Sequence, residues 1–124
     1  KYHPTDPYVM VTGGWDSNLK FYDMRIEKPF CSLLTSAHIA GDSIDIFDDM
    51  IVTGSHKESK DCMQMFSFPA KPRPFLELGK SNDKKSGYIL STKFTNNGQQ
   101  IIAGGAGMNE VKVFNNDCDT SAKF

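Results

Sequence analysis

Four aspartates lie close together in the chain, and they are the first residues whose type could hold a metal ion. Asp42, Asp45, Asp48 and Asp49 carry the carboxylate oxygens that Ca²⁺ prefers. Their spacing differs from that of the EF-hand calcium loop, and no glycine followed by a closing glutamate completes it. We therefore interpret the four aspartates as the solvated edge of a strand and its turn, and we predict no metal site.

A glycine-rich run, Gly104–Gly107, has the composition of a loop that cradles phosphate groups with backbone amides. Phosphate loops of that kind continue with Gly-Lys-Ser/Thr and open a helix, whereas a strand-like segment follows here, Glu110–Asn115. A hairpin turn is the better interpretation, so we predict no nucleotide or other cofactor.

The three histidines are His3, His38 and His56, and no two of them stand at the spacing of metal ligands. The chain also lacks a nucleophile elbow or a comparable local catalytic motif. Catalytic groups that converge only in space leave no such motif and stay an open alternative. Our prediction is a protein that is not an enzyme.

Trp15 is the residue that most directly suggests binding, because it follows two glycines in a turn and precedes Asp16. An exposed tryptophan is a typical hot spot of a protein interface. The alternative is that Trp15 packs on the neighbouring repeat, and the sequence favours neither. The corresponding turns of the other repeats contain His56, Lys57 and Met108, which complete our set of candidate protein-binding residues.

The candidate binding residues lie within one sequence pattern that occurs three times. An apolar run ends at a glycine, and an alternating run that ends near an aromatic residue follows it. The first run is found at Val9–Gly14, Met50–Ser55 and Gln100–Gly105, and the second at Leu19–Asp23, Met63–Ser67 and Val111–Asn115. A repeat of about 40–50 residues is typical of an array of small structural units.

Each repeat has the alternation and turn residues of β-strands, and no segment shows a sustained helical period. Asn96-Asn97-Gly98 is the clearest hairpin turn, whereas Pro69–Pro74 is expected to break strand pairing. The expected strands are 9–14, 18–24, 29–34, 42–47, 50–54, 62–68, 75–78, 88–95, 100–103 and 110–115. The fold class predicted from these patterns is all-β.

The composition of the chain argues against two further classes of function, nucleic-acid binding and membrane spanning. The 124 residues carry a net charge of −1, which offers no basic excess for nucleic acid, and no apolar run approaches the roughly 20 residues of a membrane span. The cysteines Cys31, Cys62 and Cys118 are odd in number and form no CxxC pair. Reduced thiols in a cytosolic protein are the favoured interpretation, with one disulfide as the alternative.

The residue detail resembles the WD40 repeats of β-propellers over essentially the whole chain. The resemblance rests on strands that end in Thr12-Gly13 and Thr53-Gly54, on the turn residue Asp16 and on the pair Tyr22-Asp23. It also rests on His38, which precedes the strand that ends in Thr53-Gly54. Other repeat positions are Phe66, Gly104 and Phe114. The copies are degenerate, because Tyr-Asp, Phe-Ser and Phe-Asn stand where the family favours Trp-Asp.

The resemblance also implies a hydrogen-bonded tetrad of histidine, serine or threonine, turn aspartate and tryptophan within each blade. The first copy offers Thr12, Asp16 and Tyr22, and the second offers His38 and Thr53. The third copy offers neither the histidine nor the aspartate. No blade is therefore expected to have an intact tetrad, and apolar packing of the aromatic residues must contribute more.

The implied architecture is a WD40-type propeller with about three four-stranded blades, at 1–34, 35–79 and 80–124. The innermost strand of the first blade and the outer strand of the last are expected to be incomplete, and so is the ring. The remaining blades are expected from the rest of a longer chain.

The implied function is a non-enzymatic scaffold for protein–protein interaction, a cytoplasmic subunit of a large complex. A cytoskeletal or ciliary assembly is one candidate. The first alternative is a module that reads a peptide or modified residue, although Ser43–Phe47 and Leu90–Phe94, the expected channel strands, show no aromatic cage. The second alternative is a propeller-type hydrolase.

Overall fold

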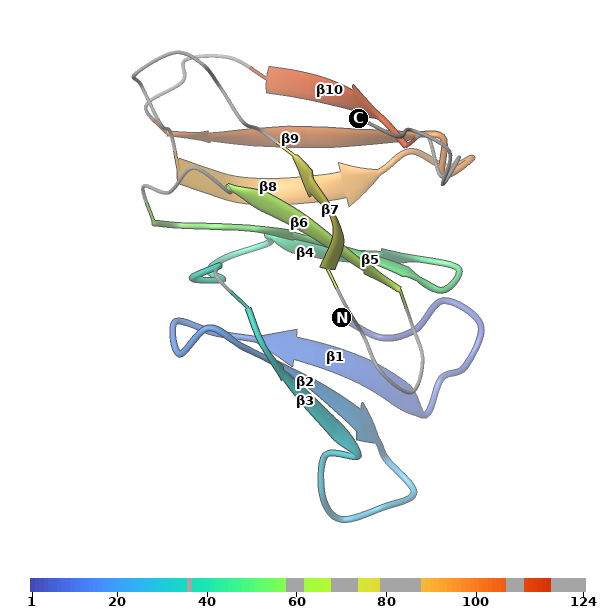
Figure 1. Ribbon diagram of the computed structural model, residues 1–124. Helices are drawn as coiled ribbons and strands as arrows, with labels where there is room; N and C mark the ends of the chain where they lie inside the picture. Colours follow the sequence, from blue (N-terminus) through green and yellow to red (C-terminus); the bar gives the residue numbers. More distant parts are fainter. Residues whose placement is uncertain (36, 58–61, 68–73, 79–87, 107–110, 117–124) are drawn as a thin grey trace.

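The computed structural model describes residues 1–35, 37–57, 62–67, 74–78, 88–106 and 111–116. Within these ranges the chain forms strands and turns and no helix, which confirms the all-β prediction. The strands make three antiparallel sheets that follow one another along the chain. Figure 1 shows the sheets stacked in a row in chain order.

The strands of each sheet pair in chain order. The first sheet contains β1 (Val9–Gly13), β2 (Asn18–Asp23) and β3 (Cys31–Leu34). The second contains β4 (Ile44–Phe47), β5 (Met50–Gly54), β6 (Met63–Ser67) and β7 (Pro74–Leu78). The third contains β8 (Tyr88–Phe94), β9 (Gln100–Ala106) and β10 (Val111–Asn115). Four strands per sheet are thus found only in the second sheet among the described residues.

The threefold sequence pattern corresponds to a threefold strand register. The equivalent residue pairs between neighbouring strands are Met10 with Tyr22, Ile51 with Phe66, and Ile101 with Phe114. On the other side of the same residues, the pairs are Tyr2 with Met10, Ile46 with Ile51, and Phe94 with Ile101. Residues aligned by their sequence pattern therefore occupy equivalent places in the three sheets.

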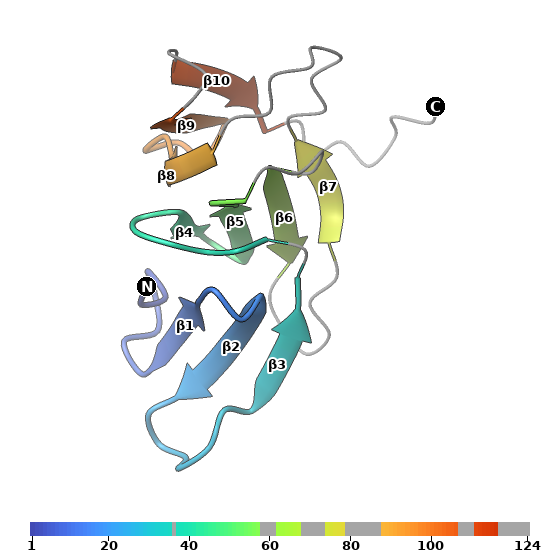
Figure 2. The same cartoon turned by 90° about the vertical axis from the view of Figure 1, so that its left-hand side faces the viewer.

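Two hydrophobic clusters lie between the sheets. The first joins the first and second sheets through Val11, Leu19, Phe21, Ala37, Ile39, Ile44, Ile46, Ile51 and Phe66. The second joins the second and third sheets through Val52, Cys62, Met63, Met65, Ile89, Ile101 and Ala103. The second sheet thus contributes both of its faces to the core, and Figure 2 shows it between the other two. The first and third sheets lie on opposite sides of it, so the three sheets do not close a ring.

Pro74 corrects the sequence prediction about the proline-rich segment. The residue was expected to interrupt pairing, but it begins β7 and pairs with Phe66 beside an irregularity in the register. A proline is tolerated at the first residue of an edge strand, because its missing N–H faces away from the sheet. The other prolines of that segment, Pro69 and Pro72, lie outside the described residues.

Gly54 allows the second and third sheets to approach closely. A Cβ atom at this position would collide with the Ile89 side chain of β8. Gly13 has the same function in the first sheet, since its Cβ would lie 2.6 Å from Ile39 Cδ1 and 2.8 Å from Ile44 Cδ1. An added Cβ would meet Ile89 at its branch point in the second copy but only the ends of two isoleucine side chains in the first, so glycine is required most strictly at Gly54.

Ion pairs connect the inner edges of the three sheets. Asp42 lies 3.2 Å from the Lys1 ammonium and 3.7 Å from that of Lys93, measured between nitrogen and oxygen. Asp45 lies 3.7 Å from Lys93 and accepts a 2.9 Å hydrogen bond from the Phe94 backbone. Two of the four aspartates considered as metal ligands are thus engaged by lysines. No group of three or more metal-ligating side chains gathers in the part of the chain that the structure describes.

We expect acid to weaken this network. The hydrogen bond from the Lys1 ammonium, together with the charge of Lys93, lowers the pKa of Asp42 below its ordinary 3.8. The unfolded chain therefore takes up this proton at a higher pH than the folded chain. The stabilisation by Asp42 is complete above pH 3.8 and is lost as the pH falls through the lower folded pKa. Urea unfolding at pH 7, 4 and 2 measures the loss.

Asp42→Asn should reduce the loss of stability between pH 4 and pH 2. Asp48→Asn, in the turn between β4 and β5, is the matched control for removing one carboxylate. An Asp42→Asn protein with the same pH dependence as the unmodified protein would contradict the expectation.

Candidate functional site

The turn between β1 and β2 holds Trp15 in a fixed position. The Ser17 backbone N–H donates to the Gly14 carbonyl at 3.3 Å, and the Asn18 N–H donates to Asp16 Oδ1 at 3.2 Å. Ser17 has a φ of 58°, which closes the turn in the left-handed region. Trp15 is nevertheless 63% exposed. Trp15 is thus exposed, as an interface residue would be, and one edge of its ring is packed, as the alternative interpretation expects.

The packed edge of Trp15 belongs to a row of rings that crosses all three sheets. The Trp15 ring centroid lies 5.1 Å from that of His56 and 6.2 Å from that of His38, both in edge-to-face orientation. His56 lies in turn 5.3 Å from Tyr88, which begins β8 and is 38% exposed. We call Trp15, His38, His56 and Tyr88 the aromatic row.

Backbone hydrogen bonds hold the row together. His56 donates its N–H to the His38 carbonyl at 2.7 Å, and Ile89 donates to the Ser55 carbonyl at 2.9 Å. The buried Ser55 hydroxyl accepts hydrogen bonds from the His38 and Lys57 amides, each at 3.2 Å. The loop before β4, the turn after β5 and the start of β8 are therefore tied together beneath the rings.

The other predicted binding residues differ in their role. Asp16 closes the turn by accepting a hydrogen bond from the Asn18 backbone. Hydrogen bonds from Asn18 also lower the pKa of the Asp16 carboxyl group, so this group is ionised at neutral pH. It also lies 3.7 Å from the Lys20 ammonium. Lys57 is exposed beside His56. Met108 lies outside the described residues.

Sequence analysis did not identify His38 and Tyr88 as parts of this surface. His38 was considered only as a member of the implied tetrad, but its ring contacts Trp15. The Thr53 hydroxyl, the other second-copy member, donates to the Gln64 carbonyl at 3.5 Å. Tyr88 could have been found from its position, because it begins the strand that follows the second repeat.

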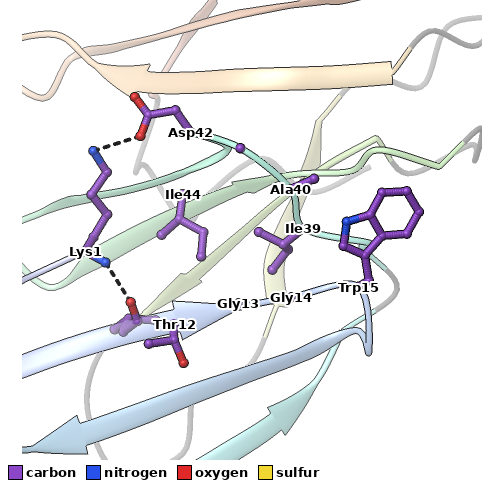
Figure 3. A pocket seen from close by; sticks show the side chains of 11 residues that line it. Lys1, Thr12, Gly13, Gly14, Trp15, Ile39, Ala40, Asp42 and Ile44 are labelled. Atoms are coloured by element: carbon purple, nitrogen blue, oxygen red, sulfur yellow. Dashed lines mark hydrogen bonds and ion pairs between the residues drawn. The ribbon is translucent and has the colours of Figure 1, made fainter.

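A groove begins at the aromatic row and runs along β1. It has a volume of about 670 Å³ and is lined by Lys1, Val11, Thr12, Gly13, Gly14, Trp15, Ile39, Ala40, Gly41, Asp42 and Ile44. Figure 3 shows Trp15 at one end and the Lys1–Asp42 ion pair at the other. The middle is formed by glycines and isoleucine side chains. An open groove lined by glycine backbone, with a charged end, suits the binding of a polypeptide segment.

Comparison with models of protein families and with curated proteins found no match to this chain. The likeness to WD40 repeats therefore rests on the motif residues. Within its described residues the structure contains no helix long and apolar enough to cross a membrane.

Proposed function

We propose that the protein is a non-enzymatic interaction scaffold and that the aromatic row binds a protein partner. The main observation in support of this proposal is the exposure of the Trp15 side chain. A large apolar ring in contact with water is costly, and its burial on a partner is favourable by about 25 cal/mol for each Å² covered. Trp15 combines this exposure with ring contacts to His38 and His56.

The fixed position of the ring adds to the expected affinity. A side chain that is already ordered loses little conformational entropy on binding. Trp15 is ordered by the closed turn and by the two imidazole edges. Tryptophan and tyrosine also combine an apolar body with a polar donor, which is why they are frequent at interface centres.

The groove beside the row supports binding of a segment of the partner chain. Its lining offers half-buried backbone at Gly13 and Gly14 and a charged end at Lys1 and Asp42, over the buried side chains of Ile39 and Ile44. A partner that covers Trp15 can place a segment in the groove over Gly13 and Gly14, because the edge of β1 at Val9–Val11 is already paired with residues 1–3. This arrangement favours a scaffold over the reader of peptides in a channel, because the inner-edge charges of Asp42, Asp45 and Lys93 are engaged with one another.

The same proposal includes the architecture and location that the WD40 resemblance implies. The three sheets are blades of a WD40-type propeller, and the protein is a subunit of a cytoplasmic multi-protein assembly. A cytoskeletal or ciliary complex is the candidate assembly. The stacked sheets and their common register support the propeller part of this proposal.

Trp15→Ala should remove partner binding and leave the fold intact. We expect a loss of about 2 kcal/mol or more in binding free energy, which is the range of an interface hot spot. The matched control is Met24→Ala, because Met24 is a comparably exposed apolar residue in the turn between β2 and β3, at the other end of the first sheet. The measurement is co-purification of the three proteins from the source cells, quantified by mass spectrometry, together with their melting temperatures.

The proposal expects one or more proteins that are retained by the unmodified and Met24→Ala proteins and lost with Trp15→Ala. The melting temperature of the Trp15→Ala protein should stay close to that of the unmodified protein. Equal recovery of all partners by the three proteins would contradict the proposal. A lowered melting temperature with unchanged binding would show that Trp15 serves packing alone.

A further inference from the structure

The turn between β8 and β9 contains Asn97-Gly98, the one asparagine–glycine pair in the sequence. The asparagine is exposed, whereas the glycine is buried and has a φ of 68°, in the left-handed region. Asparagine is most open to spontaneous deamidation when glycine follows it, because no Cβ atom hinders the approach of the glycine nitrogen. The pair therefore has the chemistry of a modification site.

Deamidation of this pair needs only water and takes two steps. The Gly98 backbone nitrogen attacks Asn97 Cγ. The N–Cγ bond forms, the Cγ–Nδ2 bond breaks, and ammonia leaves with the proton of the glycine nitrogen. Water then opens the five-membered succinimide. Hydrolysis at Cγ gives aspartate, and hydrolysis at the main-chain carbonyl carbon gives isoaspartate, whose side chain carries the peptide bond. Either product replaces a neutral amide with a carboxylate.

The folded turn holds both reacting groups in hydrogen bonds. The attacking Gly98 nitrogen donates its proton to the Thr95 carbonyl at 2.8 Å. The Asn97 amide oxygen accepts from the Thr95 hydroxyl at 2.7 Å and from the Gln99 backbone N–H at 3.1 Å. The Asn97 amide nitrogen donates to Gln99 Oε1 at 2.9 Å. The glycine nitrogen must leave the Thr95 carbonyl before the succinimide can close, so the reaction requires the turn to open.

The closed turn has no room for the longer isoaspartate linkage. Asn116 Nδ2 donates to the Gly98 carbonyl at 2.7 Å, and a Cβ atom at Gly98 would collide with the ring of Phe47, from β4. Isoaspartate adds one CH2 to the main chain directly before Gly98, which must then shift within this close-packed contact. Aspartate leaves the main chain unchanged and keeps an acceptor for the Gln99 amide.

We propose that Asn97 is a deamidation site whose reactivity is controlled by opening of the turn between β8 and β9. The hydrogen bonds of Thr95 suppress the reaction while the turn is closed. When the turn opens, the pair reacts, and isoaspartate then prevents the turn from closing as before. Asn97 lies beyond the opposite end of β8 from Tyr88, so this modification is independent of partner binding at the aromatic row.

Peptide mapping by mass spectrometry, during incubation in mildly alkaline buffer, measures the reaction at Asn97. The unmodified protein should react at least about tenfold more slowly when folded than when unfolded in guanidinium chloride, because opening the turn costs free energy. Thr95→Val removes the hydroxyl and should speed the folded reaction by about two- to tenfold, the factor for one ordinary hydrogen bond. Thr95→Ser keeps the hydroxyl and should react like the unmodified protein.

Thr5→Val is the matched control, because it removes a hydrogen-bonded hydroxyl from the segment before β1. Its rate at Asn97 should equal that of the unmodified protein. In guanidinium chloride all four proteins should react at one rate, since the turn is absent. Equal rates for the folded and unfolded unmodified protein would overturn the proposal. A folded Thr95→Val protein that reacts like Thr95→Ser would also overturn it.

Amide hydrogen exchange of Gly98, followed by nuclear magnetic resonance, measures the opening of the turn without any substitution. It tests the proposal even if Thr95→Val does not fold. We expect exchange that is slowed relative to the unfolded chain, and exchange that is not slowed would overturn the control by the turn. The purified isoaspartate product should melt at a lower temperature than Asn97→Asp. Equal melting temperatures would contradict the effect assigned to the longer linkage.

Discussion

Phe66→Ala should lower the free energy of unfolding by about 3–5 kcal/mol, the usual cost of removing a buried phenylalanine. Phe66 is 1% exposed and belongs to the cluster between the first and second sheets. The alanine would leave a cavity beside Ile51, within the cluster through which the first sheet packs on the second. For a domain with about 5–15 kcal/mol of stability, this loss is a large share. Urea denaturation followed by far-ultraviolet circular dichroism measures it.

Leu34→Ala is the matched control, because Leu34 is a 74% exposed apolar residue on β3. Its effect should stay within about 0.5 kcal/mol, as is usual for surface substitutions. A loss below about 1 kcal/mol for Phe66→Ala would show that the position is not the packing centre that the degenerate repeat requires.

Gly105→Ala should be the most damaging change of a single small residue. A Cβ atom at Gly105 would collide with the carbonyl oxygen of Tyr88, where the register between β8 and β9 shifts. Backbone atoms cannot move aside like the end of a flexible side chain. Overpacking costs about 1–3 kcal/mol, and we expect the upper end or more because the strands themselves must separate.

Gly104→Ala provides a control one residue away. A Cβ atom at Gly104 would lie 3.7 Å from Val111 Cγ2, which is an ordinary contact. We expect this variant to lose about 1 kcal/mol or less, measured by the same urea denaturation. Equal losses for the two alanine variants would contradict the steric account of Gly105.

The strands were predictable because their signals are local. Alternating apolar residues, Asn-Gly turns and the strand-ending glycines placed nearly every strand within two or three residues of its observed ends. Gly105 shows the limit of such signals, since the repeat pattern drew attention to Gly104. The steric demand falls on Gly105 because of a register shift in β8, which depends on pairing across the sheet and leaves no local pattern. Pro74 was missed for a similar reason, because an edge strand tolerates a proline.

The candidate surface was predictable in part. The repeat alignment placed Trp15 and His56 in corresponding turns, and the structure brings their rings into contact. Alignment could not show how far Trp15 is exposed, because exposure depends on the packing of neighbouring sheets. It assigned His38 to the implied tetrad, and the proximity of the His38 ring to the indole could not be foreseen because it depends on how the loop before β4 packs beside the turn after β1.

Binding of a partner through Trp15 is tested most directly by the affinity of the purified pair. Isothermal titration calorimetry would compare a partner identified by co-purification with the unmodified, Trp15→Ala and Met24→Ala proteins. We predict a dissociation constant at least about 30-fold larger for Trp15→Ala, which corresponds to about 2 kcal/mol, and an unchanged value for Met24→Ala. Dissociation constants that agree within about twofold for all three folded proteins would contradict the claim.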